Sequence, residues 1–268
     1  MHISHTTPIP PRELADRFLS HGRYAFTLDD AAAATGTSRG AAADALERLH
    51  RRGQVFSPAR GMYVAIPPEY RSWRVLPGEW FIDAMMAHLG RSYYVALLSA
   101  AAIHGASHQA PQVFQVMTDG ASPVRDRDIG RVRLRFYASK HLSEADVERA
   151  TVPTGYMALS TRETTVVDLV SHYQTAGGYS NVATILKEIG QLSGSAVARM
   201  ASPRGRAVVR RAGWLLERYG QADDLEALRQ AARLDLGEPA LLAPAGGRRG
   251  KTDRDWRLRI NTAVEPDL

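Results

Sequence analysis

The segment Ala245–Thr252, AGGRRGKT, has the spacing of a phosphate-binding loop, in which backbone amides and a lysine hold nucleotide phosphates. Such a loop needs a buried strand before it and a helix after it, because the helix N-terminus must face the phosphate. Only the short run Leu241–Pro244 precedes it, and the pattern of Asp253–Asn261 after it predicts a strand. The sequence therefore favours a basic surface loop over a nucleotide site.

Two histidines, His104 and His108, have the four-residue spacing of metal ligands on one helix face. Gly105 is expected to end the helix between them, and no acidic residue that could complete the site is nearby. We therefore interpret His104 as a structural residue at a helix end and expect no metal site.

Other catalytic patterns are missing from the sequence. The common metal-dependent nuclease pattern has an acid two residues before a lysine, but Ala138, Ile185 and Arg249 stand at those positions. There is no Gly-x-Ser-x-Gly nucleophile motif. The absence of cysteine excludes disulfides, thiolate metal sites and cysteine nucleophiles. We expect a protein without catalytic activity or cofactor.

Charge and hydropathy point to a nucleic-acid partner and away from a membrane. The 268-residue chain carries a net charge of +6, which favours polyanionic partners. No apolar run approaches the roughly eighteen residues of a membrane-spanning helix. The first residues show no secretory signal pattern, so we expect a cytoplasmic protein.

The N-terminal residues have the element order of a winged helix-turn-helix. Pro10-Pro11 suits the start of a helix, and Thr27 is a good cap for a short second helix. Gly36 supplies a turn, and a longer helix then runs to about Arg52. A β-hairpin over residues 54–66 follows. Helix, short helix, turn, long helix and hairpin together predict the winged fold.

The long helix of this region carries the candidate DNA-reading residues. In a helix-turn-helix, the N-terminal residues of the second helix reach base edges, and here these are Thr37, Ser38 and Arg39. Arginine can donate two hydrogen bonds to guanine. Asp44 and Glu47 on the same helix would repel phosphates if they faced the groove. The alternative is a domain that binds only protein. The arginines expected to meet phosphates are Arg48, Arg51, Arg52 and Arg60.

The fold class expected for the whole chain is α+β. We predict a winged helix-turn-helix over residues 1–77 and a larger mixed α/β domain over 78–268. Within the second domain, a buried helix is predicted over Tyr93–Ile103, and Ser160–Glu163 forms a capping box for a helix that follows. Strands are predicted at 113–118, 131–137, 154–159 and 256–261, and further helices at 79–89, 164–173, 181–192, 206–219 and 223–234.

Two rows of arginine lie outside the N-terminal region. Alternation places Arg131, Arg133 and Arg135 on one face of a strand, and Arg206 and Arg210 lie on one predicted helix beside Arg204 and Arg211. These rows either extend a DNA or partner contact or form a solvated face.

Several segments together resemble the AbiEi family of antitoxins from bacterial type IV toxin–antitoxin systems. The most specific segment is Tyr93–Gly105, YYVALLSAAAIHG. Val113–Thr118, VFQVMT, and Leu159–Leu169, LSTRETTVVDL, are similar as well, as are the N-terminal winged helix and the end of the chain around Trp256.

The resemblance implies a regulator with two jobs. The N-terminal domain would bind inverted repeats in its own promoter and repress the operon. The C-terminal domain would neutralise a nucleotidyltransferase-like toxin, directly or indirectly. The family consists of non-enzymatic regulators, and we expect a monomer in solution that binds double-stranded DNA cooperatively.

Two other classes of function stay open at this point. One is a winged-helix regulator that responds to a small ligand, for which the apolar Tyr93–Ile103 segment could line a pocket. The other is an enzyme fused to a DNA-binding domain, which the missing catalytic patterns disfavour.

Overall fold

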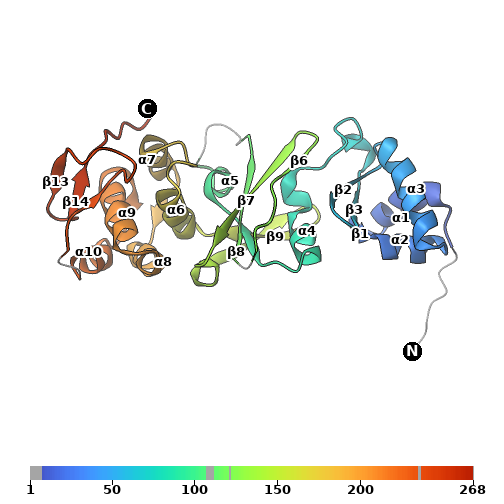
Figure 1. Cartoon of the computed structure of the whole chain (residues 1–268), viewed down its shortest axis with the longest axis horizontal. Coiled ribbons are helices and arrows are strands. Elements are labelled where there is room, and N and C mark those ends of the chain that lie inside the picture. The colour runs from blue at the N-terminus through green and yellow to red at the C-terminus, as the bar shows by residue number, and fades with distance from the viewer. Residues whose placement is uncertain (1–7, 107–111, 121, 235–236, 268) are drawn as a thin grey trace. The chain divides into compact units, whose positions relative to one another are not determined.

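The computed structural model describes residues 8–106, 112–120, 122–234 and 237–267 (Figure 1). The chain forms two compact units. The first comprises Met1–Ser92, Arg125–Arg135 and Arg149–Met157, and the second comprises Tyr93–Val124, Phe136–Glu148 and Ala158–Leu268. The division that we predicted between residues 77 and 78 stays a prediction. The protein is a mixed α+β chain, as the sequence predicted.

The first unit begins with helices and a small antiparallel sheet of strand order β1-β3-β2. Its first elements are η1 (Pro11–Glu13), α1 (Leu14–Ser20), β1 (Ala25–Thr27), α2 (Leu28–Thr35), α3 (Arg39–Arg51), β2 (Val55–Ala59) and β3 (Met62–Ala65). The helices pack on a core that includes Leu14, Phe18, Phe26, Leu46 and Leu49. Apolar residues three and four apart on α1 and α3 supply this core, as their helical spacing predicted.

Local hydrogen bonds fix where α2 and α3 begin. The Thr27 hydroxyl accepts from the Asp30 amide at 3.1 Å, and the Asp30 carboxylate accepts from the Thr27 amide at 2.7 Å. Gly36, with φ of 63°, ends α2 in the left-handed conformation that glycine adopts without strain. Ser38 then caps α3 by accepting from the Ala41 amide. The start positions predicted from the sequence are thus confirmed.

Short helices follow the hairpin in the same unit. They are η2 (Pro68–Tyr70), η3 (Gly78–Trp80) and α4 (Ile82–His88).

A six-stranded sheet has the order β6-β7-β5-β4-β9-β8. Strand β4 pairs antiparallel with β5 and parallel with β9. The strands are β4 (Tyr93–Val95), β5 (Phe114–Asp119), β6 (Arg127–Ile129), β7 (Val132–Ser139), β8 (Val147–Val152) and β9 (Gly155–Ser160), with η4 (Leu142–Glu144) between β7 and β8.

The helix predicted over Tyr93–Ile103 is wrong in its first residues. These form β4, and the helix α5 (Leu97–Ile103) starts only at Leu97, which has φ of 55°. A central strand and a buried helix are both apolar all round, so periodicity does not separate them. The two edge strands β6 and β8 were missed because they are short or exposed.

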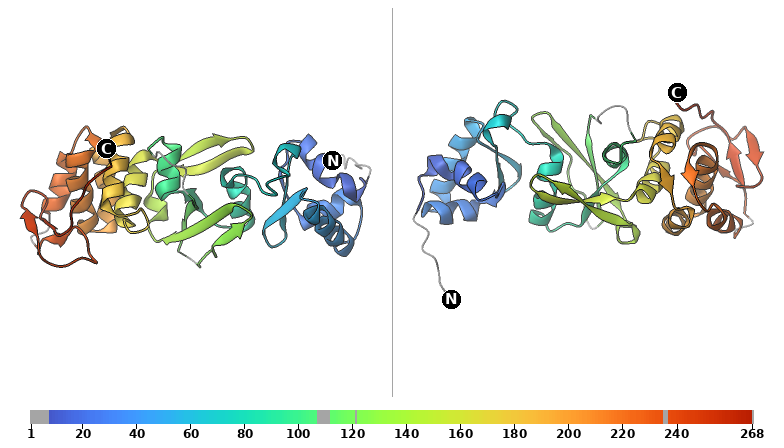
Figure 2. Two further views of the ribbon diagram at one scale, coloured as in Figure 1. Left: turned by 90° about the horizontal axis from the view of Figure 1, so that it is seen from above. Right: turned by 180° about the vertical axis from the view of Figure 1, so that it is seen from behind.

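The helices that follow the sheet pack on one another in the second unit (Figure 2). They are α6 (Arg162–Ser171), α7 (Tyr179–Glu188), α8 (Gly194–Ala201), η5 (Ser202–Arg204), α9 (Arg206–Tyr219) and α10 (Glu226–Arg233). The cap of α6 is Thr161, whereas the Ser160 hydroxyl donates to the Val95 carbonyl. No helix in the described part of the chain is long and apolar enough to span a membrane.

The last residues close over α9. Buried Trp256 packs on Gly213, where a Cβ atom would lie inside the indole ring's contact distance. The indole N–H donates to Glu217 at 2.7 Å. The small strands here are β10 (Gln191–Leu192) paired with β11 (Gln221–Ala222), and β12 (Ala240–Leu241), β13 (Lys251–Asp253) and β14 (Leu258–Ile260) in a second sheet.

Candidate functional site

The N-terminus of α3 lies open to solvent. Thr37, Ser38, Arg39 and Gly40 are all exposed, while Ala42 of the next turn is buried. The cap on Ser38 and the burial of one face of α3 hold this end of the helix in place. The exposed end therefore presents a short, small-residue surface with one long cation.

Arg39 forms an ion pair with Asp29 of α2. Both side chains are more than 60% exposed, at 63% and 69%. An exposed ion pair of this kind contributes little to stability, so a competing anion can replace the carboxylate at small cost.

The other arginines of this region differ in their surroundings. The side chains of Arg48 and Arg52 are exposed and make no hydrogen bond or ion pair with another described residue. The Arg51 Nε atom lies 3.5 Å from the Glu47 carboxylate. Arg60 is exposed at the turn between β2 and β3. Asp44 and Glu47 are also exposed on α3, where their carboxylates would repel a phosphate that came close.

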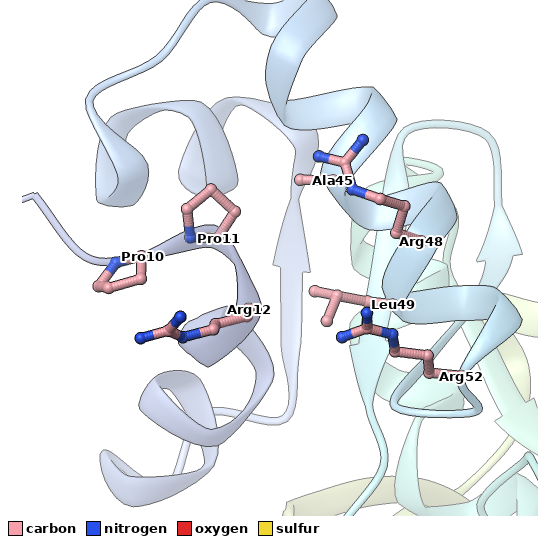
Figure 3. Close-up of a pocket in the computed structure, with 7 residues that line it drawn as sticks. All are labelled: Pro10, Pro11, Arg12, Ala45, Arg48, Leu49 and Arg52. Atoms are coloured by element: carbon pink, nitrogen blue, oxygen red, sulfur yellow. The ribbon is translucent and has the colours of Figure 1, made fainter.

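A groove of about 280 Å³ runs between η1 and α3 (Figure 3). It contains Arg12, a residue that the sequence analysis missed because nothing in the sequence indicates that η1 lies against α3. Its lining residues are Pro10, Pro11, Arg12, Ala45, Arg48, Leu49 and Arg52.

Arg131, which directly precedes β7, and Arg133 and Arg135 on β7 have different neighbours. The Arg131 guanidinium stacks on the Trp73 ring, 4.4 Å from its centroid, and Arg133 is exposed. Arg135 donates to Asp128 at 2.7 Å, and this hydrogen bond lowers the pKa of the Asp128 carboxyl. Arg135 is therefore largely neutralised, whereas Arg131 and Arg133 face solvent.

The two arginines predicted on α9 have opposite environments. Arg206 is exposed at the first position of the helix. Arg210 is fully buried and donates to the Glu238 carbonyl at 3.0 Å. Burial lowers the pKa of the Arg210 guanidinium. Its place in the core keeps Arg210 away from a DNA or protein surface, so we leave it out of the proposed contacts.

A buried ionic network lies inside the second unit. Asp168 of α6 accepts from the Tyr94 hydroxyl at 3.0 Å and from Arg204 at 2.9 Å. Arg204 also donates to the Met200 carbonyl. Burial raises the pKa of Asp168 to about 6, although Arg204 and the Tyr94 hydrogen bond act in the opposite direction. The network joins β4, α6 and η5 and is closed to solvent, which suits a structural role.

The structure describes most residues of the two patterns that the sequence disfavours. Lys251 and Thr252 lie in β13, which pairs antiparallel with β14, so no helix N-terminus follows the glycines. His104 Nε2 is 2.7 Å from the Ser160 carbonyl oxygen, and His108 lies outside the described residues. Within those residues, no three His, Asp or Glu side chains gather as a metal would require.

Residues 94–218 match the family model of the AbiEi antitoxin C-terminal domain. This segment is similar to the AbiEi antitoxin C-terminal domain. The resemblance seen in the sequence is thus confirmed. The AbiEi segment contains the whole buried network of Tyr94, Asp168 and Arg204. The basic groove at α3 lies outside it.

The fold also matches a solved structure. The chain is similar to the crystal structure of the RV2827C protein from Mycobacterium tuberculosis, with a TM-score of 0.67 and 14% sequence identity. The match covers 93% of this chain and 91% of that one. At this identity the likeness concerns the fold alone. No match was found among curated proteins.

Proposed function

We propose that this AbiEi antitoxin is a DNA-binding autorepressor whose N-terminal residues 1–77 form a winged helix-turn-helix. The observation that carries the proposal is the exposed, capped start of α3, which follows α2 across the left-handed Gly36. The β2–β3 hairpin comes next in the chain. In DNA-binding domains with this order, the second helix of the pair enters the major groove and the hairpin contacts the backbone.

The proposed roles follow from side-chain chemistry. Arg39 exchanges its Asp29 partner for the O6 and N7 atoms of a guanine, and Thr37 and Ser38 lie beside it. A second contact with DNA or with a partner involves Arg131, Arg133 and Arg206, with a weaker part for the paired Arg135. The backbone phosphates are met by Arg48, Arg51, Arg52 and Arg60.

Residues 78–268 act, in this proposal, as the antitoxin part against a nucleotidyltransferase-like toxin. The AbiEi match supports that role. We propose that the protein works in the cytoplasm without catalysis or cofactor, directly on the toxin or indirectly. It would be a monomer that binds its own promoter repeats cooperatively.

The two jobs can be tested separately in one strain. The full chain is expressed beside a reporter under its own promoter and, in a second plasmid, beside the neighbouring toxin gene. We expect the wild type to repress the reporter and to restore growth. Arg39→Ala should lose repression and keep growth rescue. The matched control Arg233→Ala, which removes an exposed arginine of α10, should keep both.

Either failure is informative. Repression that persists in Arg39→Ala would remove that residue from base reading, and absent repression by the wild type would refute autoregulation. Absent growth rescue by the wild type would refute the antitoxin role.

A further inference from the structure

The arginines around α3 fall into two groups by their neighbours. Arg39 and Arg51 each lie beside a carboxylate, on Asp29 and Glu47 respectively. Arg48 and Arg52 have no acidic partner in the described part of the chain. The uncompensated positive charge of α3 therefore lies on the side that carries Arg48 and Arg52.

That side of α3 faces the groove against η1. Ala45, Arg48, Leu49 and Arg52 recur every three to four residues, so they share one face of the helix. Arg12 belongs to η1 on the opposite wall (Figure 3). Three arginines from two elements thus line one opening of about 280 Å³. The Arg12 guanidinium points away from α3 in Figure 3, and because its side chain is exposed it can turn toward the opening.

The walls of the groove are held in fixed positions. Two prolines precede Arg12, and their rings restrict the backbone of η1. Leu49 and Ala45, which form the floor, are buried at 2% exposure each. Small Ala45 leaves room above it for a ligand.

The charges in the groove select an oxyanion. The only acid beside its arginines is Glu13, whose carboxylate is 3.4 Å from Arg12 Nε in the described structure. Both side chains are exposed, so this pair is weak. Asp44 and Glu47 do not line the groove. Guanidinium groups match the geometry of phosphate oxygens, to which they donate two hydrogen bonds at once.

We propose that this groove holds one backbone phosphate of duplex DNA, with Arg12, Arg48 and Arg52 as the donors. The inference rests on the proposed DNA-binding function and deepens it. It adds Arg12 to the interface and states which side of α3 faces the phosphate backbone. It also makes the three arginines one site, so their contributions to binding are coupled.

The test measures the affinity of the full chain for its upstream duplex at several salt concentrations. Each neutralised phosphate contributes a slope of about −0.9 in log K against log salt. The triple variant Arg12→Gln, Arg48→Gln, Arg52→Gln should reduce the slope by about 1, whereas three separate phosphate contacts would reduce it by about 3. Each single variant should lose on the order of tenfold in affinity. Arg233→Gln is the charge-matched control.

Neutral methylphosphonate links, placed singly along each strand, locate the phosphate. We expect one position per site where the link weakens the wild type and leaves the triple variant unchanged. Variants that bind like the wild type, or a slope loss near 3, would overturn the single-phosphate groove while DNA binding stands. A wild type that binds no duplex at any salt concentration would overturn the proposed function and the groove together. Circular dichroism confirms that the variants fold.

Discussion

The buried pair of Asp168 and Arg204 makes the stability of the second unit depend on pH in a specific way. Burial raises the pKa of Asp168 from 3.8 to about 6. The folded state therefore holds a proton between these values that the unfolded state has released. Stability from this group is full below about pH 4 and is lost as the pH rises through 6, by about 3 kcal/mol in total.

Replacing Arg204 should enlarge this loss. Arg204 is 6% exposed at its side chain and lowers the pKa of Asp168, so Arg204→Met leaves the carboxyl buried with a pKa above 6. At pH 8 the carboxylate is then buried without its cation, which costs about 3–5 kcal/mol. At pH 5 Asp168 is mostly protonated in both proteins, and the variant should lose the two hydrogen bonds that Arg204 donates, to the Met200 carbonyl and to Asp168, about 1 kcal/mol each.

Urea denaturation of the full chain at pH 5 and pH 8, followed by circular dichroism, measures both values. The double variant Asp168→Asn, Arg204→Met is the control, because it has no buried carboxyl to titrate. Its loss relative to Asp168→Asn should not grow between the two pH values. An Arg204→Met variant that loses equally at pH 5 and pH 8, or nothing at pH 8, would refute the reasoning.

Two further predictions concern packing and capping. Gly213→Ala should lower the free energy of unfolding of the second unit by about 1–3 kcal/mol or more, because the new methyl group overlaps the Trp256 ring. Gly247→Ala, where the space is open, is the control and should have no such effect. Thermal unfolding followed by tryptophan fluorescence compares the two variants, and equal melting temperatures would contradict the packing. Ser38→Ala should lower the free energy of unfolding by about 1 kcal/mol by removing the cap of α3, and Ser38→Asp should restore it, as chemical denaturation measures. A Ser38→Ala variant as stable as the wild type would mean that the cap contributes nothing.

Local signals made the N-terminal elements predictable from the sequence. The caps at Thr27 and Ser38 and the glycine at position 36 act within a few residues, so they could be identified without knowing the fold. The span of α9, Arg206–Tyr219, was also predicted, because its apolar stripe is long and regular.

Features that depend on distant partners could not be predicted. Strand β4 is a strand because Val95 pairs with Val116 and Leu159, which lie far away in the chain. Arg210 has the same type and spacing as an exposed arginine, but in the folded chain it is fully buried and donates to the Glu238 carbonyl. Arg12 lines a groove only because η1 packs against α3, which comes about thirty residues later in the chain.

The central claim is that α3 reads a specific DNA sequence. Fluorescence anisotropy of the full chain on its own upstream duplex and on a shuffled duplex, at the same salt concentration, tests it most directly. We expect the upstream duplex to bind at least about a thousandfold more tightly, and Arg39→Ala to cost about 1–3 kcal/mol mainly on that duplex. Equal affinity for both duplexes, or no binding to either, would contradict it.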